Sequence, residues 1–249
     1  MHDYQASNDA LNNKVILVTG AGDGIGKVAA IEFAKHGATV ILLGKTVAKL
    51  EAVYDEIIAL GAPQPAIVPL DMKGATKQHY RDLAATIENE FGRLDGLLNN
   101  ASIIGSLGPL EHFCVSTFEN IMKVNVTAQA VLTKSLFPLL RKSDNASILF
   151  TSSGVGREGR EFWGAYAISK FATEGMMQTW SKEVGKTNIR INCINPGATR
   201  TAMRAIAFPG EDKDKLKTPA DLMPTYLYLM SDDSIGVNGQ SIDAQPRVC

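Results

Sequence analysis

The chain has 249 residues, and its 25 Lys and Arg side chains almost balance its 26 Asp and Glu side chains. This balance argues against a nucleic-acid protein with a broad basic surface and against a polybasic membrane binder. Hydrophobic residues make up 45% of the chain and charged residues 20%, which is ordinary for a globular domain and excludes a disordered chain. The length allows one or two domains.

The cysteines and the N-terminus bear on the compartment. The chain has three cysteines, an odd number that cannot pair completely, and they form no C-x-x-C motif: Cys114, Cys193 and Cys249. We therefore expect a reducing environment. Residues 1–13 are polar and lack a secretory signal, and the first apolar run, residues 15–18, is too short to span a bilayer. We predict a cytoplasmic protein with no membrane or nucleic-acid partner, whose residues 1–13 form a flexible arm.

Short apolar runs alternate along the chain with longer segments of helical period. The expected strands cover residues 14–19, 38–43, 66–70, 94–98, 146–152, 188–195 and 240–244. The expected helices cover residues 24–36, 46–60, 76–91, 117–140, 164–184 and 219–230, with Pro138 kinking or ending the fourth. The alternation predicts an α/β fold of the Rossmann-type, doubly wound kind, with a seven-stranded, mostly parallel sheet and helices on both faces. Residues 14–249 would form one domain, with a substrate lid at 197–218.

A glycine-rich turn follows the first expected strand, where Thr19 and the glycines at positions 20, 24 and 26 form the pattern T-G-x-x-x-G-x-G. Glycine tolerates a positive φ angle and, lacking a Cβ, lets backbone N–H groups approach a pyrophosphate. The N-terminus of the following helix adds partial positive charge. The functional interpretation is a dinucleotide site, and the structural alternative is a merely flexible turn.

The end of the second strand bears on which dinucleotide is bound. A site for NAD carries Asp or Glu there to hold the ribose 2′-OH, whereas this chain reads Leu43-Gly44-Lys45-Thr46. Lys45 could pair with the 2′-phosphate of NADP, so we predict NADP rather than NAD. Against this, Lys45 could be a solvated lysine at a helix start, and the carboxylate of Asp23 would repel a nearby phosphate.

A candidate chemical group lies in the fifth expected helix. Tyr166 and Lys170 are four residues apart and therefore share a helix face. The ordinary pKa of tyrosine is about 10, and a nearby ammonium group favours the phenolate, as general acid–base catalysis near neutrality requires. Alone, Y-x-x-x-K occurs by chance in many helices. Ser153 follows the fifth strand and could donate a hydrogen bond to a substrate carbonyl oxygen, with Ser152 as the competing candidate.

These motifs occur together and in order, and the chain resembles the short-chain dehydrogenase/reductase family, in its single-domain branch, from about residue 14 to residue 244. Within the family it looks closest to uncharacterised bacterial oxidoreductases and 3-oxoacyl-carrier-protein reductases. The resemblance implies a set of cofactor-binding residues: Gly20, Gly22, Asp23, Gly24, Ile25, Gly26, Lys45, Asp71, Met72, Asn99, Asn100, Ala101, Tyr166, Lys170, Pro196, Gly197, Thr199 and Thr201.

The resemblance also implies hydride transfer between NADP(H) and a carbonyl compound or secondary alcohol. Tyr166 would be the general acid and base, Lys170 would lower its pKa, Ser153 would polarise the carbonyl, and Asn125 would hold a water that links Lys170 to a proton relay. The substrate would be a small molecule, with an acyl thioester as one candidate. Family members associate through two long helices, so we expect a homodimer or homotetramer that uses residues 117–140 and 164–184.

Two departures from the family pattern stand out. Ser102 occupies the position of a glycine in N-N-A-G, where its side chain could crowd a cofactor. The last expected strand keeps Gly239-Gln240 but lacks the usual D-G-G ending.

Other polar and aromatic residues have ordinary interpretations. The four histidines are scattered, and no pair has metal-ligand spacing, so we predict no metal site. Phe162 and Trp163 could line a substrate pocket or pack beneath a loop. Arg157 and Arg160 could meet an anionic substrate or be solvated. A catalytically silent, NADP-binding sensor or scaffold is the alternative function, although such proteins usually lose the tyrosine or the lysine.

Overall fold

The computed structural model describes residues 1–246, and Cys249 lies outside this range. Within it, seven strands form one parallel sheet in the order β3-β2-β1-β4-β5-β6-β7. Their bounds are β1 Val15–Thr19, β2 Thr39–Gly44, β3 Ala66–Pro69, β4 Gly96–Asn99, β5 Ala146–Thr151, β6 Ile189–Asn195 and β7 Ser241–Asp243. The central strands β1, β4 and β5 are buried along their whole length, as their continuous apolar sequence requires.

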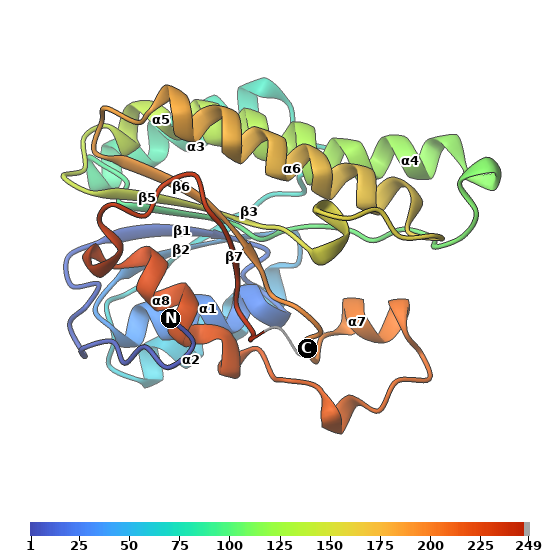
Figure 1. Ribbon diagram of the computed structural model, residues 1–249. Coiled ribbons are helices and arrows are strands. Elements are labelled where there is room, and N and C mark those ends of the chain that lie inside the picture. Colours follow the sequence, from blue (N-terminus) through green and yellow to red (C-terminus); the bar gives the residue numbers. More distant parts are fainter. Residues whose placement is uncertain (247–249) are drawn as a thin grey trace.

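Helices cover both faces of the sheet, as predicted (Figure 1). One face carries α3 (Lys77–Phe91), α5 (Gln129–Leu140) and α6 (Gly164–Glu183), and the other carries α1 (Gly24–Lys35), α2 (Val47–Ala59) and α8 (Met223–Met230). Two apolar cores separate accordingly, one on each side of the sheet. The chain reverses direction across the sheet between β1 and β4, and open α/β sheets bind ligands at the carboxyl ends of the strands at such a point.

The long helix predicted for residues 117–140 is present but is not uniform. It consists of α4 (Val115–Met122), a π-helical segment η2 (Lys123–Ala128) and α5. Pro138 lies inside α5, which continues to Leu140, so the proline does not end the helix at once. π-Helical turns are frequent at functional sites, and this one contains Asn125.

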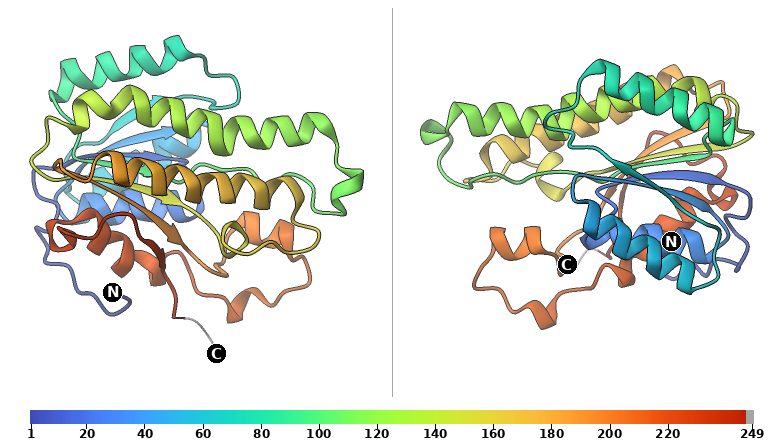
Figure 2. Two further views of the ribbon diagram at one scale, coloured as in Figure 1. Left: turned by 45° about the horizontal axis from the view of Figure 1, so that its top comes forward. Right: turned by 180° about the vertical axis from the view of Figure 1, so that it is seen from behind.

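Residues 197–218, predicted to be irregular, include the short helix α7 (Ala202–Ala207) and one turn of 3₁₀ helix, η4 (Lys213–Lys215). The side chain of Thr201 caps α7 by accepting a hydrogen bond from the Arg204 N–H. Figure 2 shows this stretch projecting from the same end of the molecule as the start of α4.

The N-terminal segment contacts the body of the protein, although its polar composition predicts a flexible arm. Leu11 is 0% exposed and its N–H donates to the His36 carbonyl. The Tyr4 ring packs edge-on against Tyr228, and its hydroxyl donates to Asp233 at 2.5 Å. Leu11 and Tyr4 therefore attach the segment to the rest of the protein. The polar composition of residues 1–13 as a whole gives no sign of these two contacts.

Candidate active site

A cavity of about 490 Å³ lies at the carboxyl ends of the strands. Segments that are far apart in the sequence meet there: the turn after β1, the starts of α2 and α6, the loops after β4 and β5, and α7. Most of the predicted cofactor residues line it, namely Gly20, Gly22, Asp23, Gly24, Ile25, Lys45, Asp71, Met72, Asn100, Ala101, Tyr166, Pro196, Gly197, Thr199 and Thr201. The predicted catalytic residue Ser153 also lines it.

The glycine-rich turn has the geometry that its sequence predicts. Gly20 and Gly24 adopt φ angles of 68° and 53°, which side chains other than glycine rarely reach. Gly26 does not line the cavity; a Cβ there would lie 2.3 Å from the Gly20 carbonyl oxygen, so this glycine allows α1 to pack against the turn. The turn thus leaves its backbone open to a phosphate at the start of α1.

The Asp23 carboxylate, which was expected to repel a phosphate here, has two partners. It accepts a hydrogen bond from the Gly24 N–H at 2.7 Å and forms an ion pair with Lys49 on α2. The hydrogen bond from Lys49 lowers the pKa of Asp23. Lys49 lines the cavity together with Lys45 and Lys73, so three cations stand beside two acids, Asp23 and Asp71. Lys49 was not among the predicted residues, although it lies only four positions after Lys45, in the first turn of α2.

The segment after β4 is held to β1 through Thr19. The Thr19 hydroxyl accepts from the Asn100 and Ala101 N–H groups, each at 2.9 Å, and donates to the Leu98 carbonyl. Asn99, predicted to bind the cofactor, instead turns away from the cavity and donates to Thr133 Oγ1 at 3.1 Å. Strand alternation explains this difference, because neighbouring residues point to opposite faces.

The side chain of Gln245, which follows β7, holds the segment after β6 in place. Gly197 has φ 70°, and the Gln245 amide donates to the carbonyls of Pro196 and Ala198 at 2.8 and 2.9 Å. Gln245 was not among the predicted residues, because its role depends on the return of the chain after β7.

Two of the predicted catalytic residues, Ser153 and Tyr166, line the other end of the cavity, whereas Lys170, also predicted to bind the cofactor, is buried beside Tyr166 and is not a lining residue. Tyr166 is 7% exposed, and the neighbouring Ser153 hydroxyl opposes the rise in its pKa that burial causes. Lys170 is 1% exposed; its Nζ lies 5.5 Å from the centre of the Tyr166 ring and donates to the Thr151 carbonyl at 2.8 Å. Burial raises the pKa of Tyr166 to about 12 and lowers the pKa of Lys170 to about 8. The tyrosine is therefore a protonated acid at neutral pH, beside a lysine that is still charged.

Asn125 is fully buried behind this pair. Its Oδ1 accepts from the Ile103 N–H, and its Nδ2 donates to the Ile103 carbonyl and to Ser169 Oγ, all at 2.9 to 3.0 Å. Its side chain thus joins the loop after β4 to α6, the helix that carries Tyr166 and Lys170.

The structure separates the two candidate serines. Both line the cavity, but Ser152 is buried and its Oγ donates to Glu174 Oε1 at 2.5 Å, whereas the Ser153 side chain lies beside Tyr166. Arg157, predicted to be solvated or to face an anionic substrate, instead contacts Glu174, Ser241 and Asp243.

Apolar groups form the walls near Tyr166. The Trp163 ring lies 5.8 Å from both Tyr166 and Phe208, and Met203 packs in the same cluster. Phe162, in contrast, is exposed with φ 69°. Ser102 lines the cavity and is not among the described non-glycine residues with positive φ, so its Cβ requires no left-handed backbone.

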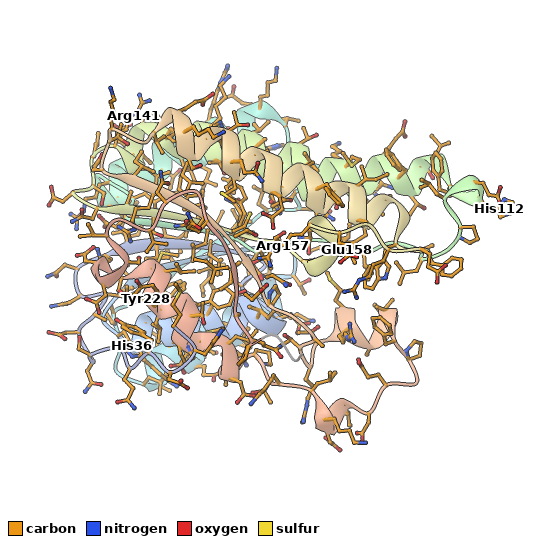
Figure 3. All side chains as sticks on the ribbon, viewed as in Figure 1. His36, His112, Arg141, Arg157, Glu158 and Tyr228 are labelled. Carbon is orange, nitrogen blue, oxygen red and sulfur yellow. The ribbon has the colours of Figure 1, made fainter. Side chains whose placement is uncertain are left out.

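Metal and membrane features are lacking in the described range. No group of three His, Cys, Asp or Glu side chains within residues 1–246 could hold a metal ion. Figure 3 shows His36 and His112 at opposite ends of the molecule. None of the helices in this part of the chain is long and apolar enough to cross a bilayer.

Comparison with known proteins identifies the family. A family model for short chain dehydrogenases matches residues 14–212. The chain is 52% identical over 246 residues to YciK, an uncharacterised oxidoreductase of Escherichia coli (strain K12), with 99% of this chain and 97% of that protein covered.

Solved structures of similar sequence indicate the same family. A short chain dehydrogenase from Pseudomonas syringae has a TM-score of 0.96 and 56% identity, with 98% of this chain and 99% of that chain covered. Another, from Shigella flexneri 2a, was solved in complex with NADP; it has a TM-score of 0.94 and 52% identity, with 96% and 100% covered. With the glycine turn, the sheet order and the Tyr166–Lys170 pair in place, the chain belongs to the short-chain dehydrogenase family.

Proposed function

We propose that this protein is an NADP(H)-dependent oxidoreductase that interconverts a carbonyl compound and a secondary alcohol. The observation that carries the proposal is that Ser153 and Tyr166 line one end of a cavity whose other end is a glycine-rich turn, with Lys170 buried against the Tyr166 ring. A scaffold that only binds NADP has no need of a buried lysine against a buried tyrosine.

The cavity fits a dinucleotide. The turn at Gly20 and Gly24 would hold the pyrophosphate, and Asp71 and Met72 would flank the adenine. Lys45 and Lys49 would hold a 2′-phosphate, in keeping with the NADP seen in the Shigella flexneri protein. When bound, the nicotinamide supplies or accepts the hydride.

The side chains would manage the oxygen and its proton. Ser153 donates a hydrogen bond to the carbonyl oxygen, and Tyr166 gives that oxygen its proton in reduction or removes it in oxidation. The positive charge of Lys170 stabilises the phenolate left on Tyr166. Because both hydrogens of Asn125 Nδ2 are already donated, the water that we expect at Asn125 would be held by an oxygen of this residue, either Oδ1 or the backbone carbonyl.

Tyr166→Phe tests the proposal. The variant should bind NADPH as the wild type does but lose at least about 100-fold in turnover, since general acid–base assistance contributes roughly 10²–10⁴. Turnover is measured as NADPH oxidation over a panel of ketones, aldehydes, quinones, steroids and acyl thioesters. Near-normal turnover in the variant would exclude Tyr166 as the acid, and a wild type that reduces no member would favour a silent NADP-binding protein.

A further inference from the structure

Helix α6 presents a third polar residue on the face that carries Tyr166 and Lys170. Glu174 follows Lys170 by four residues, as Lys170 follows Tyr166, so the three side chains lie along one face. Glu174 is 5% exposed. A buried carboxylate is costly unless it is paired and hydrogen-bonded, so its surroundings indicate what it does.

The Glu174 carboxylate joins three parts of the fold. Its Oε1 accepts from Ser152 Oγ at 2.5 Å and from Ser241 Oγ of β7 at 2.7 Å, and it lies 3.6 Å from Arg157 Nε. Arg157 in turn donates to Ser241 Oγ at 2.9 Å and to Asp243 at 2.5 Å. The end of β5, the loop after it and β7 are thus tied to the middle of α6.

These contacts orient three consecutive residues, Thr151 at the end of β5 and the two serines that follow it. The Thr151 carbonyl accepts from Lys170, and the Ser152 hydroxyl donates to Glu174. Successive side chains of extended backbone point to opposite sides, and Ser153 has extended angles, with φ −162° and ψ 158°. Holding Ser152 inward against Glu174 therefore directs Ser153 outward toward Tyr166.

Charge gives Glu174 a second effect. The groups that face Lys170 are Tyr166 and Glu174 on α6 itself and Cys193 on β6, with Arg157 beyond Glu174. Burial and the nearby Glu174 raise the pKa of the Cys193 thiol, so Cys193 is neutral and offers Lys170 no counter-charge. Glu174 is the carboxylate that opposes the loss of the lysine proton on burial.

We propose that Glu174 is a positioning residue of the active site, which sets the orientation of Ser153 through Ser152 and keeps Lys170 charged. This inference rests on the proposed function for its catalytic meaning, but its two effects can be measured separately.

The charge effect has a test that needs no substrate. The wild type and Glu174→Gln are labelled with ¹³C-lysine, and the ε-carbon signal of Lys170, assigned with Lys170→Arg, is followed against pH. In Glu174→Gln the titration midpoint should fall by about one pH unit, as expected for loss of a charge one helical turn away. Glu183→Gln, which removes an exposed acid from the same helix, is the matched control and should leave the midpoint in place.

The positioning effect is tested with Ser152→Ala and Glu174→Asp, using a carbonyl that the panel shows to be reduced. Ser152→Ala should lower kcat at least about tenfold, as misplaced catalytic groups do, without moving the Lys170 midpoint. Glu174→Asp keeps the charge and should likewise hold the midpoint while lowering kcat. If Glu174→Gln does not fold, these two variants still decide the positioning effect, and Glu174→Ala takes its place in the lysine titration.

The outcomes separate the two proposals. A folded Glu174→Gln with an unmoved Lys170 midpoint would overturn the charge effect, and unchanged kcat in Ser152→Ala and Glu174→Asp would overturn the positioning effect. If the wild type reduces no carbonyl, the proposed function and the catalytic role of Glu174 both fail, while the lysine titration still decides the charge effect.

Discussion

Lys170 combines two properties that oppose each other. Its burial against Tyr166 brings its charge to the phenol, but the same burial lowers the pKa of the ammonium group to about 8. The charge is therefore present below pH 8 and lost above it. Tyr166 shows the opposite shift, because burial raises its pKa to about 12 and keeps it protonated. At neutral pH the pair is set to donate a proton.

This pairing predicts opposite pH profiles for the two directions. Carbonyl reduction needs the phenol and a charged Lys170, so its kcat should be steady to about pH 8 and fall above it. Alcohol oxidation needs the phenolate of Tyr166, so its rate should rise through the alkaline range. Steady-state rates in both directions over the same buffers measure this, and parallel profiles would contradict it.

The Lys49–Asp23 pair predicts how the cofactor is selected. Binding of a 2′-phosphate offers Lys49 a second anion, so Lys49→Ala should weaken NADPH about tenfold more than it weakens NADH, since a hydrogen bond to a charged group contributes about 1.5–3 kcal/mol. Cofactor fluorescence titrations give both dissociation constants. Lys35→Ala, at the far end of α1, is the control, and equal losses for the two cofactors would remove Lys49 from the 2′-phosphate.

At the scale of elements, the periodicity of the sequence was sufficient to predict the strands and helices. It did not predict the local interruptions between and within them. The strands and helices lie close to their predicted bounds because each is a clear apolar run or amphipathic repeat. The π-helical turn at Asn125 and the helix α7 depend on tertiary contacts that no periodicity records. For the same reason Tyr166 and Lys170 could be predicted from a motif, whereas Glu174 and Gln245 depend on how β7 returns to the site.

The N-terminal segment gives a prediction at this scale. Leu11 is fully buried, so Leu11→Ala should lower the free energy of unfolding by about 2–5 kcal/mol, as truncation of a packed leucine does. Urea denaturation measures the loss, and Asn8→Ala, at an exposed position, is the control. A change below 0.5 kcal/mol, typical of surface positions, would show that the segment is a loose arm after all.

On the scale of the whole molecule, one parallel sheet brings the site together from strands that are remote in sequence. Helix α6 contributes residues both to this site and to the protein surface. Its inner face carries Tyr166 and Lys170, while Ile168 and Phe171 stand on the outer face with exposed fractions of 38% and 45%. Exposed apolar groups of this size on a long helix are typical of an association surface.

Assembly through α6 is therefore a further prediction. Phe171→Glu should convert a dimer or tetramer to a smaller species, because a charge would be buried at the contact. Light scattering after gel filtration gives the mass, and Gln178→Glu on the same helix is the control for added charge. A wild type that is already a monomer, or a variant of unchanged mass, would exclude this surface.

The contacts of Asp243 and Gln245 have a practical consequence. These residues lie within the last seven positions of the 249, yet they hold the Arg157 loop and the segment after β6. Substitutions at Gln245 should therefore be felt at Pro196 and Gly197, which line the cavity, although Gln245 itself is not a lining residue.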